Sequence, residues 1–551
     1  MFITNSTYRT YLVTDSTMIP ESSTFIDQVT ESIMGGASMV QLREKTLSTR
    51  DFIERAKAVR KVTKEFCIPL IINDRIDVAL AVNADGVHVG QDDMPAITVR
   101  KILGEKKLIG VTCSNPEEVK QVCEEGVADY IGVGTVFKTN TKKDVKDPKG
   151  CGPIGIRKML KVLGDHNRTA KKEIKVVAIG GINHDNAGSV LYQCSLPGLQ
   201  SLTGLAVVSC IMASEEPKYA TADFDRYYQE QELPTMDNLD GETAQDIVKM
   251  IKGVRSNSPL VHHITNNVVK NFSANVTLAL GASPIMSELA NEFEEFTCKF
   301  KNLSLVLNLG TPIPEQIELF KSAMKVYNAA GHHIVFDPVA AGASLARLQC
   351  CKDILNAGYV SVIKGNLGEI SALLKLTSGY SSTERNSINR VVSRGVDSVD
   401  SEVEEKDIFE LGEAVARDFK CVVVITGSTN YIFDGICLSA NVRSPVRIAK
   451  VPGGSKLMGS ITGTGCSLGS TIGAFLAGCA TDVNGTPIFI DPFSAVWGAV
   501  TYYNVAGSVA GKIGTGPGSF MINFLDCLNN VEKLEPILKE KKLFGNFTEA
   551  P

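Results

Sequence analysis

Eight short runs rich in Val, Ile and Leu recur between residues 11 and 211, and helical segments separate them. Such continuous apolar runs are typical of parallel strands that are covered on both faces. Eight similar units within about 200 residues predict a closed TIM (β/α)8 barrel, with a doubly wound open sheet as the alternative. The predicted strands are Tyr11–Asp15, Met39–Arg43, Pro69–Asp74, Gly86–Gly90, Leu108–Cys113, Tyr130–Phe137, Val176–Ile182 and Leu205–Ile211.

Polar residues follow the carboxyl ends of these runs, at the edge where barrel enzymes carry their active sites. Arg and Lys gathered there suit a phosphorylated substrate, and carboxylates from separate strands suit Mg²⁺. Taken singly, the charged run is also compatible with a solvated surface, and the aspartates with a helix cap. Their common edge favours a site built from Gln41 to Lys45, Asn73, Asp74, Asp92, Asp93, Lys138 to Asp144, Gly180, Gly181, Val208 and Ser209.

The motifs Q-L-R-E-K, I-N-D, V-H-V-G-Q-D-D, T-x-T-K-K-D and I-G-G-I follow one another in this region. With them, residues 8–225 resemble thiamine phosphate synthase. The resemblance implies that hydroxymethylpyrimidine diphosphate is coupled to hydroxyethylthiazole phosphate and that pyrophosphate is released. Positioning and electrostatics matter more for such a reaction than a strong base does.

Site roles follow from this resemblance position by position. Thr112 stands where the family usually has Ser, so a hydroxyl is kept. The pyrimidine diphosphate would contact Gln41, Leu42, Arg43, Glu44, Lys45, Asn73, Thr112 and Lys142. Mg²⁺ would bind Asp74 and Asp93, and the thiazole phosphate would contact Thr139, Asn140, Thr141, Gly181, Val208 and Ser209.

A polar stretch near residue 235 precedes a second α/β region and predicts two domains, residues 1–235 and 236–551. The apolar runs in the second region predict an open, mostly parallel sheet. Residues 378–405 are polar and charged and are interpreted as an inserted loop. The predicted strands are a run starting at Leu260, then Ser304–Asn308, His333–Asp337, Tyr359–Lys364 and Val422–Thr426.

The stretch Ile461–Ala474 combines alternating Gly and Thr with a segment of small and apolar residues. Gly463 and Gly465 allow consecutive amides to point into one cavity, and the N-terminus of a helix beginning at Cys466 would add further N–H groups. This arrangement suits a phosphate. At such a position the pKa of the Cys466 thiol is expected to fall, which would make a thiolate base available. The alternative is a glycine turn before a core helix with a buried Cys.

The motifs H-I-T-N-x-V-x-x-N-F-x-A-N, G-A-S-P-x-M, D-P-V, K-G-N-x-x-E-I, I-T-G and T-G-T-G-C also occur in this region. They resemble hydroxyethylthiazole kinase, a ribokinase-like fold, over residues 245–540. The resemblance implies ATP as co-substrate, Cys466 as the base, and trimeric kinase domains that would make the chain a homo-oligomer. Lys364 replaces an Arg that is common in bacterial members. The implied contacts are Met286 and Gly463 to the thiazole alcohol, Lys364 and Thr426 to ATP, and Asp337 and Glu369 to Mg²⁺.

Composition narrows the setting. The net charge of −5 gives no electrostatic case for binding nucleic acid or a membrane surface. The N-terminus lacks a secretory pattern, and apolar stretches are shorter than the ~20 residues of a bilayer span. Fourteen Cys without C-x-x-C pairs indicate reduced thiols and a cytoplasmic protein.

The two resemblances explain each other, because the kinase half would make the thiazole phosphate that the barrel half consumes. The whole chain therefore resembles the fungal bifunctional enzymes of thiamine biosynthesis. One alternative is a sugar-phosphate barrel fused to a sugar kinase, which predicts Asp in place of Cys466. The other is a thiamine-responsive binding protein with inactive sites, which predicts the loss of residues that bind Mg²⁺ or phosphate.

Overall fold

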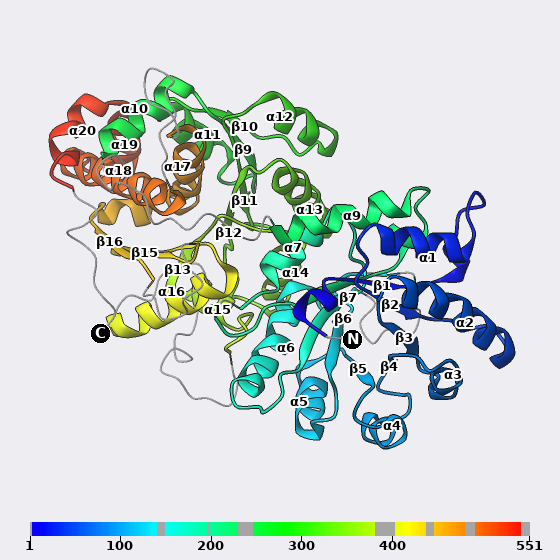
Figure 1. Ribbon diagram of the computed structural model, residues 1–551. Coiled ribbons are helices and arrows are strands. Elements are labelled where there is room, and N and C mark those ends of the chain that lie inside the picture. Colours follow the sequence, from blue (N-terminus) through cyan, green and yellow to red (C-terminus); the bar gives the residue numbers. More distant parts are fainter. Residues whose placement is uncertain are drawn as a thin grey trace. The chain divides into compact units, whose positions relative to one another are not determined.

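The computed structural model describes residues 3–139, 141, 149–196, 198–229, 246–380, 403–436, 446–479 and 491–541. The chain divides into two compact units, residues 1–234 and 235–551 (Figure 1). The domain boundary predicted near residue 235 lies outside the described residues, as does most of the predicted inserted loop.

The first unit is a closed barrel of eight parallel strands in sequence order, in which β8 pairs with β1. This confirms the TIM barrel and excludes the open sheet. The core lies between the strands and the surrounding helices, which Figure 1 shows in blue to green. The strands are β1 Thr10–Val13, β2 Met39–Leu42, β3 Leu70–Asn73, β4 Gly86–Val89, β5 Leu108–Cys113, β6 Tyr130–Gly134, β7 Lys175–Ile179 and β8 Gly204–Val207.

Amphipathic helices cover the outside of the barrel. In the second of them, the apolar residues Phe52, Ala56 and Val59 recur at helical spacing and are buried, and Ser48 caps the first turn. The helices of this unit are α1 Phe25–Met34, α2 Thr49–Glu65, α3 Ile76–Val82, α4 Ala96–Leu103, α5 Pro116–Glu125, α6 Gly152–Asn167, α7 Ala187–Gln193, α8 Ser209–Met212 and α9 Pro217–Gln229.

Most of the predicted strands are one or more residues too long at the carboxyl end. The largest error is the run Leu205–Ile211, because β8 ends at Val207 and α8 begins at Ser209. A short apolar run does not distinguish a buried strand from a buried helical turn, since both hide every side chain. The error matters because Val208 and Ser209 thereby become part of the turn at the barrel mouth.

Closure of the barrel depends on a close approach at Gly204. A Cβ atom there would lie 1.6 Å from the carbonyl oxygen of Tyr8. Gly204→Ala should therefore destabilise the first unit by about 2–3 kcal/mol, because β1 or β8 must shift. Urea unfolding followed by circular dichroism should show an earlier transition. Trp497, the single Trp of the chain, lies in the second unit, so its fluorescence should not change in that transition.

The control for this substitution is Gly518→Ala, where a Cβ atom would meet no atom within 4 Å. Equal unfolding midpoints for the two variants would show that the strands at Gly204 tolerate the added methyl group.

The second unit contains an open eight-stranded sheet in the order β10-β9-β11-β12-β13-β14-β15-β16. Its strands are parallel except that β15 is antiparallel to both β14 and β16, which confirms the predicted open, mostly parallel sheet. Three of these strands, β10, β15 and β16, are absent from the sequence prediction. The strands are β9 Leu260–Ile264, β10 Ser283–Ile285, β11 Leu303–Asn308, β12 His333–Asp337, β13 Val362–Asn366, β14 Val422–Thr426, β15 Thr429–Asp434 and β16 Ile448–Pro452.

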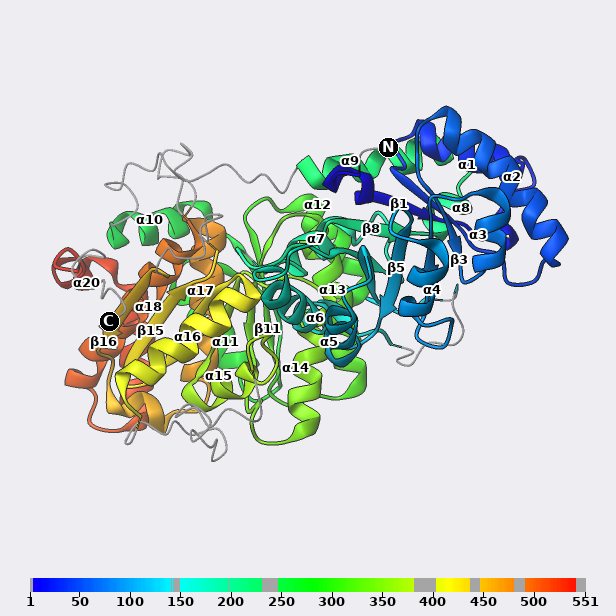
Figure 2. The same ribbon diagram turned by 60° about the horizontal axis from the view of Figure 1, so that its bottom comes forward.

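Helices cover both faces of this sheet. Figure 2 shows α16 and α18 on opposite sides of β15, and α17 packs with α18 while contacting β9, β11 and β12. Across the described ranges of both units, every helix is too short or too polar to cross a bilayer. The helices are α10 Ile247–Asn257, α11 Lys270–Ala279, α12 Phe293–Lys299, α13 Pro314–Ala329, α14 Leu345–Ala357, α15 Leu367–Leu374, α16 Glu405–Phe419, α17 Thr464–Gly478, α18 Pro492–Ile513, α19 Pro517–Asn529 and α20 Val531–Leu538.

Candidate active sites

A cavity of about 400 Å³ opens at the carboxyl ends of the barrel strands. Side chains from most of the strands reach it, as expected when parallel strands end at one edge. The structure brings together twelve of the predicted site residues in its wall, namely Gln41, Arg43, Lys45, Asn73, Asp74, Asp93, Thr112, Thr139, Thr141, Gly181, Val208 and Ser209.

Two predicted contacts do not reach this wall. Leu42 is fully buried in the hydrophobic core between strands and helices. Glu44 is buried and accepts hydrogen bonds from Arg55 Nη1 at 2.6 Å and Ser16 Oγ at 2.9 Å. The Glu44 carboxylate is therefore engaged in holding α2 against the barrel. Asn140 and Lys142 lie outside the described residues.

Two carboxylates meet on one side of the cavity. Asp74 adopts a left-handed conformation at the end of β3, with φ of 59°, and pairs with Lys45. Asp93 accepts a hydrogen bond from the amide of Gly90 at 2.7 Å. Burial, followed by hydrogen bonding to Asp74, raises the pKa of Asp93. Two carboxyl groups in contact need a shared proton or a cation, so this pair has the chemistry of a Mg²⁺ site.

The rest of the wall suits anions. Arg43 lies 3.9 Å from Asp15, a distance that leaves its guanidinium available to a ligand. Gly180 and Gly181 have φ of 102° and 69° where β7 ends. A Cβ atom at Gly181 would lie 2.8 Å from the carbonyl oxygen of Lys138, so only glycine permits this turn. The turn therefore brings backbone to the cavity wall.

A chain of hydrogen bonds beneath the cavity was not predicted from the sequence. It joins Gln41 to Tyr11, Tyr11 to Tyr130, Tyr130 to His88, and His88 to Thr112. Tyr11, His88 and Tyr130 lie within three of the predicted strands. Their polar atoms inside apolar runs were the available signal, because a hydroxyl buried in a barrel needs a partner.

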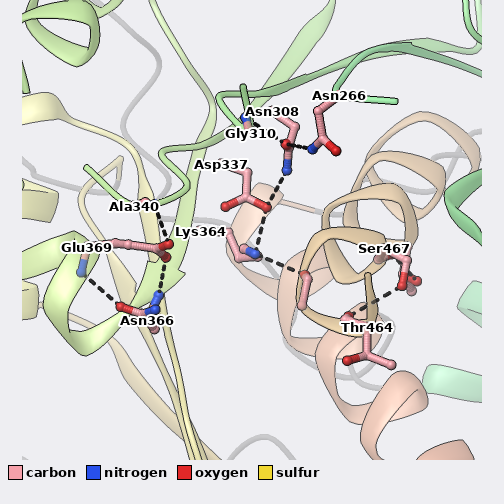
Figure 3. Close-up of polar contacts among 12 residues, drawn as sticks. Asn266, Asn308, Gly310, Asp337, Ala340, Lys364, Asn366, Glu369, Thr464 and Ser467 are labelled. Carbon is pink, nitrogen blue, oxygen red and sulfur yellow. Dashed lines mark hydrogen bonds and ion pairs between the residues drawn. The ribbon is translucent and has the colours of Figure 1, made fainter. Parts of the chain in front are cut away.

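The second unit holds an ion pair at the carboxyl edge of its sheet (Figure 3). Lys364 Nζ donates to Asp337 Oδ2 at 2.8 Å and to the carbonyl oxygen of Gly465 at 2.9 Å. Asn308 Nδ2 donates to the same Asp337 oxygen at 2.9 Å. Burial raises the pKa of Asp337, and the neighbouring lysine opposes this. The other oxygen of Asp337 is buried and has no hydrogen-bond partner among the described residues, which fits a position where a cation binds.

The side chain of Asn266 supports this arrangement by donating to Asn308 Oδ1 at 2.9 Å (Figure 3). The asparagine at the end of β11 therefore orients Asp337 and is itself oriented by the loop after β9. The role of Asn308 was not predicted. The signal for it is that Asn308 is the last residue of a predicted strand, where site residues are expected.

Glu369 lies beside this pair at the start of α15. Its carboxylate accepts from the amides of Ala340 at 2.8 Å and Asn366 at 2.7 Å, and Asn366 caps the helix in return. Burial, then the charge of Asp337, raises the pKa of Glu369 to about 7. Among the described residues, no group of three or more His, Cys, Asp or Glu side chains is placed to hold a metal ion. Mg²⁺ needs only one or two carboxylates beside phosphate and water.

The helix predicted to start at Cys466 begins at Thr464, and Gly463 at its N-cap has φ of 97°. In the part of the chain that the structure describes, no side chain caps this end, so the first-turn amides are open to an anion. The predicted fall in the thiol pKa is wrong. Burial and the charge of Asp337 raise the pKa of Cys466 to about 12. The helix terminus is outweighed because the thiol is desolvated beside carboxylates.

The remaining predicted contacts lie at the same edge of the sheet or near the helix. Met286 directly follows β10, and a Cβ atom at Gly463 would lie 3.2 Å from Phe272 of α11. Thr426 ends β14 and lines a second, smaller cavity of about 150 Å³ with Leu367 and Gly427.

The raised pKa of Glu369 predicts a pH dependence of stability. Between about pH 4.5 and 7 the folded second unit should bind more protons than the unfolded chain, so its free energy of unfolding should fall as pH rises and level off above about 7. Asp337 contributes with the same sign, because its pKa is also raised. Urea unfolding followed by Trp497 fluorescence without Mg²⁺ measures this slope. Glu369→Gln should flatten it, and equal slopes would contradict the assignment.

Both units are similar to known protein families. A family profile described as the hydroxyethylthiazole kinase family matches residues 251–534, and one described as thiamine monophosphate synthase matches residues 10–211. A hydroxyethylthiazole kinase structure from Pyrococcus horikoshii is 34% identical and covers 51% of this chain and 92% of its own, with a TM-score of 0.41.

Two curated relatives extend over nearly the whole chain. The thiamine biosynthetic bifunctional enzyme of Saccharomyces cerevisiae is 40% identical over 97% of this chain and 98% of its own length. The probable thiamine biosynthetic bifunctional enzyme of Schizosaccharomyces pombe is 36% identical over 95% of each. These matches favour a bifunctional thiamine biosynthetic enzyme over both alternatives from the sequence. The chain therefore belongs to the family of bifunctional thiamine biosynthetic enzymes, with a thiamine-phosphate synthase unit followed by a hydroxyethylthiazole kinase unit.

Proposed function

We propose that the second unit phosphorylates 4-methyl-5-(2-hydroxyethyl)thiazole with ATP. The first unit then couples the product to hydroxymethylpyrimidine diphosphate, giving thiamine phosphate and pyrophosphate. The observation that carries this proposal is shared by both sheets, since each presents a pair of neighbouring acidic side chains beside a lysine at its carboxyl edge. These groups are Asp74, Asp93 and Lys45 in the barrel, and Asp337, Glu369 and Lys364 in the second unit.

In the kinase unit, Asp337 and Glu369 would hold Mg²⁺ directly or through water, and Mg²⁺ would neutralise charge on the ATP phosphates. Lys364 stays charged: burial lowers its pKa, but the charges of Asp337, Cys466 and Glu369 with the hydrogen bond to Asp337 together outweigh burial, and the net pKa is raised. The open amides of α17 would stabilise the transferring phosphoryl group. Thr426 would contact ATP, and Met286 with Gly463 would contact the thiazole alcohol.

Cys466 would receive the proton of the alcohol. With a pKa near 12 the thiol is almost wholly protonated in the free protein, and only its small thiolate fraction can accept the proton. Phosphoryl transfer passes through a loose transition state, in which the attacking oxygen needs little activation before it bonds to phosphorus. The proton can then leave late, when the oxygen has become acidic. The role of Cys466 is thus acceptance and positioning more than prior abstraction.

In the barrel, Asp74 and Asp93 would hold Mg²⁺, which would neutralise the departing pyrophosphate. Gln41, Arg43, Lys45, Asn73 and Thr112 would contact the pyrimidine diphosphate. Loss of pyrophosphate leaves a methylene cation that the aminopyrimidine stabilises, and the thiazole nitrogen attacks it.

On the opposite side, the thiazole phosphate would contact Thr139, Thr141, Gly181, Val208 and Ser209. The groups that line the cavity would thus hold the two substrates in line and neutralise the charge of their phosphates. Lys142 and Asn140 belong to the same proposal on the strength of the motif alone.

Assembly and location are further parts of the proposal. Leu278 on α11 and Ile522 on α19 are 58% and 62% exposed, and these two helices pack together. Apolar groups exposed on neighbouring helices favour a homo-oligomer formed through kinase units, which the resemblance describes as a trimer. The cysteine pattern favours the cytoplasm. Light scattering of the purified chain gives the oligomeric state.

The test of function is a single incubation of purified chain with hydroxyethylthiazole, ATP, Mg²⁺ and hydroxymethylpyrimidine diphosphate. Formation of thiamine phosphate is expected, because both half-reactions then run in sequence. If none forms, thiazole phosphate is added directly. Product at that stage would overturn the kinase assignment alone, and no product would overturn the synthase assignment.

A further inference from the structure

The hydrogen bonds beneath the barrel cavity form one continuous series, which we call the tyrosine chain: Gln41, Tyr11, Tyr130, His88 and Thr112. Gln41 Nε2 donates to Tyr11 Oη at 2.9 Å, and the two tyrosine hydroxyls lie 2.7 Å apart. Tyr130 Oη lies 3.1 Å from His88 Nδ1, and His88 Nε2 lies 2.8 Å from Thr112 Oγ1. Its two ends and His88 line the cavity, whereas both tyrosines are buried below it.

The tyrosine chain has a direction. Each hydroxyl carries one proton, and burial raises the pKa of both Tyr11 and Tyr130, so both remain protonated. Since Tyr11 accepts from Gln41, its own proton finds an acceptor among the described residues only at Tyr130. Tyr130 then donates to His88 Nδ1. The ring must therefore carry its proton on Nε2, which donates to Thr112.

The direction decides what the two ends offer a ligand. Because Gln41 Nε2 donates to Tyr11, the amide oxygen of Gln41 remains as an acceptor. Within the described ranges no protein group donates to that oxygen. Thr112 accepts from His88 and keeps its hydroxyl proton as a donor. Turning the Gln41 amide over would reverse every bond and exchange these roles. The two ends are thus coupled through three buried side chains.

The surrounding backbone makes room for this contact. A Cβ atom at Gly110 would lie 2.4 Å from Tyr130 Oη and 2.5 Å from His88 Nδ1. Another at Gly132 would lie 3.2 Å from the His88 ring. Two glycines on β5 and β6 therefore clear the space in which Tyr130 and His88 meet. An apolar barrel interior would not require this.

We propose that Tyr11, Tyr130 and His88 are positioning residues that fix the polarity of the pyrimidine site and make it select an amino group over a carbonyl. The inference rests on the proposed coupling function. An aminopyrimidine offers an N–H donor and a ring-nitrogen acceptor, which complement the acceptor at Gln41 and the donor at Thr112. The analogue with a carbonyl oxygen in place of the amino group offers an acceptor and a ring N–H donor, so both contacts become mismatched.

The experiment is calorimetric titration of the full chain, with Mg²⁺ and without thiazole phosphate, using hydroxymethylpyrimidine diphosphate and its carbonyl analogue. The quantity measured is the ratio of the two dissociation constants. Tyr130→Phe and Tyr11→Phe each break the tyrosine chain without changing ring packing. Each should reduce the preference for the amino compound by roughly tenfold to a hundredfold, because the two ends can then reorient separately.

Tyr8→Phe is the matched control. Tyr8 is buried in the same cluster with its ring centroid 5.4 Å from that of Tyr130, and in the described structure its hydroxyl joins no hydrogen bond. It should keep the wild-type ratio. Thr112→Val, which removes the hydroxyl at the end of the tyrosine chain, should lower the ratio.

An unchanged ratio in both chain variants would overturn the proposal, as would an equal loss in Tyr8→Phe, which would indicate general loosening of the cluster. If one variant fails to fold, the other decides. Failure of the wild-type chain to bind and couple the aminopyrimidine diphosphate would overturn the proposed function itself. This result is distinguishable from failure of the further proposal, because it is obtained with the wild-type chain before any variant is measured.

Discussion

Asp74→Asn should reduce coupling of supplied thiazole phosphate by about 10²- to 10³-fold and leave phosphorylation of the thiazole alcohol unchanged. The expected size is that of removing one electrostatic contact to a developing charge. Asn keeps the shape of the side chain and tolerates the left-handed backbone at this position, so the loss would reflect charge. Both rates are measured on the same purified protein at saturating Mg²⁺.

The control is Asp77→Asn. Asp77 follows Asp74 by three positions, and its carboxylate pairs with Arg75 at the surface. Exposed pairs contribute little, so coupling should stay near the wild-type rate. Unchanged coupling in Asp74→Asn would refute the metal assignment. Loss of both half-reactions in folded protein would refute independent sites.

Cys466→Ala should have the reverse effect and lower phosphorylation of the alcohol by about 10²- to 10⁴-fold, the range for a positioned proton acceptor. Coupling of supplied thiazole phosphate should continue, because the barrel has its own site. The rates are measured with each substrate added separately.

Cys479→Ala provides the comparison for Cys466→Ala, since Cys479 is buried at the opposite end of α17 and outside the site. Its kinase rate should stay within a few fold of wild type. A loss below tenfold in Cys466→Ala would assign most of the catalysis to the helix amides, Lys364 and the metal. The high thiol pKa makes this distinction worth measuring.

Patterns in the sequence predict the parts of the fold that repeat. Eight apolar runs of similar length predict the barrel, because only closure gives each strand two neighbours and two covered faces. The same reasoning misses β10, which has three residues, and β15 and β16, which form an antiparallel extension of the sheet. Short strands leave too few residues for a pattern.

The candidate-site residues likewise divide into those that the sequence predicts and those that it does not. Residues at strand ends, such as Asp74 and Lys364, are predictable because parallel strands end at one edge. Glu44 breaks the rule because Arg55, eleven positions later on the next helix, takes its carboxylate. The thiol pKa of Cys466 and the tyrosine chain depend on which groups meet across the fold. A linear motif does not contain that information.

Each compact unit has its own hydrophobic core and one site. Joining them in one chain sets the number of kinase centres equal to the number of synthase centres in every cell, whatever the level of expression. The steady supply of the phosphorylated intermediate then depends on the ratio of two turnover rates and not on gene dosage. Selection can adjust that ratio only by changing residues within a unit.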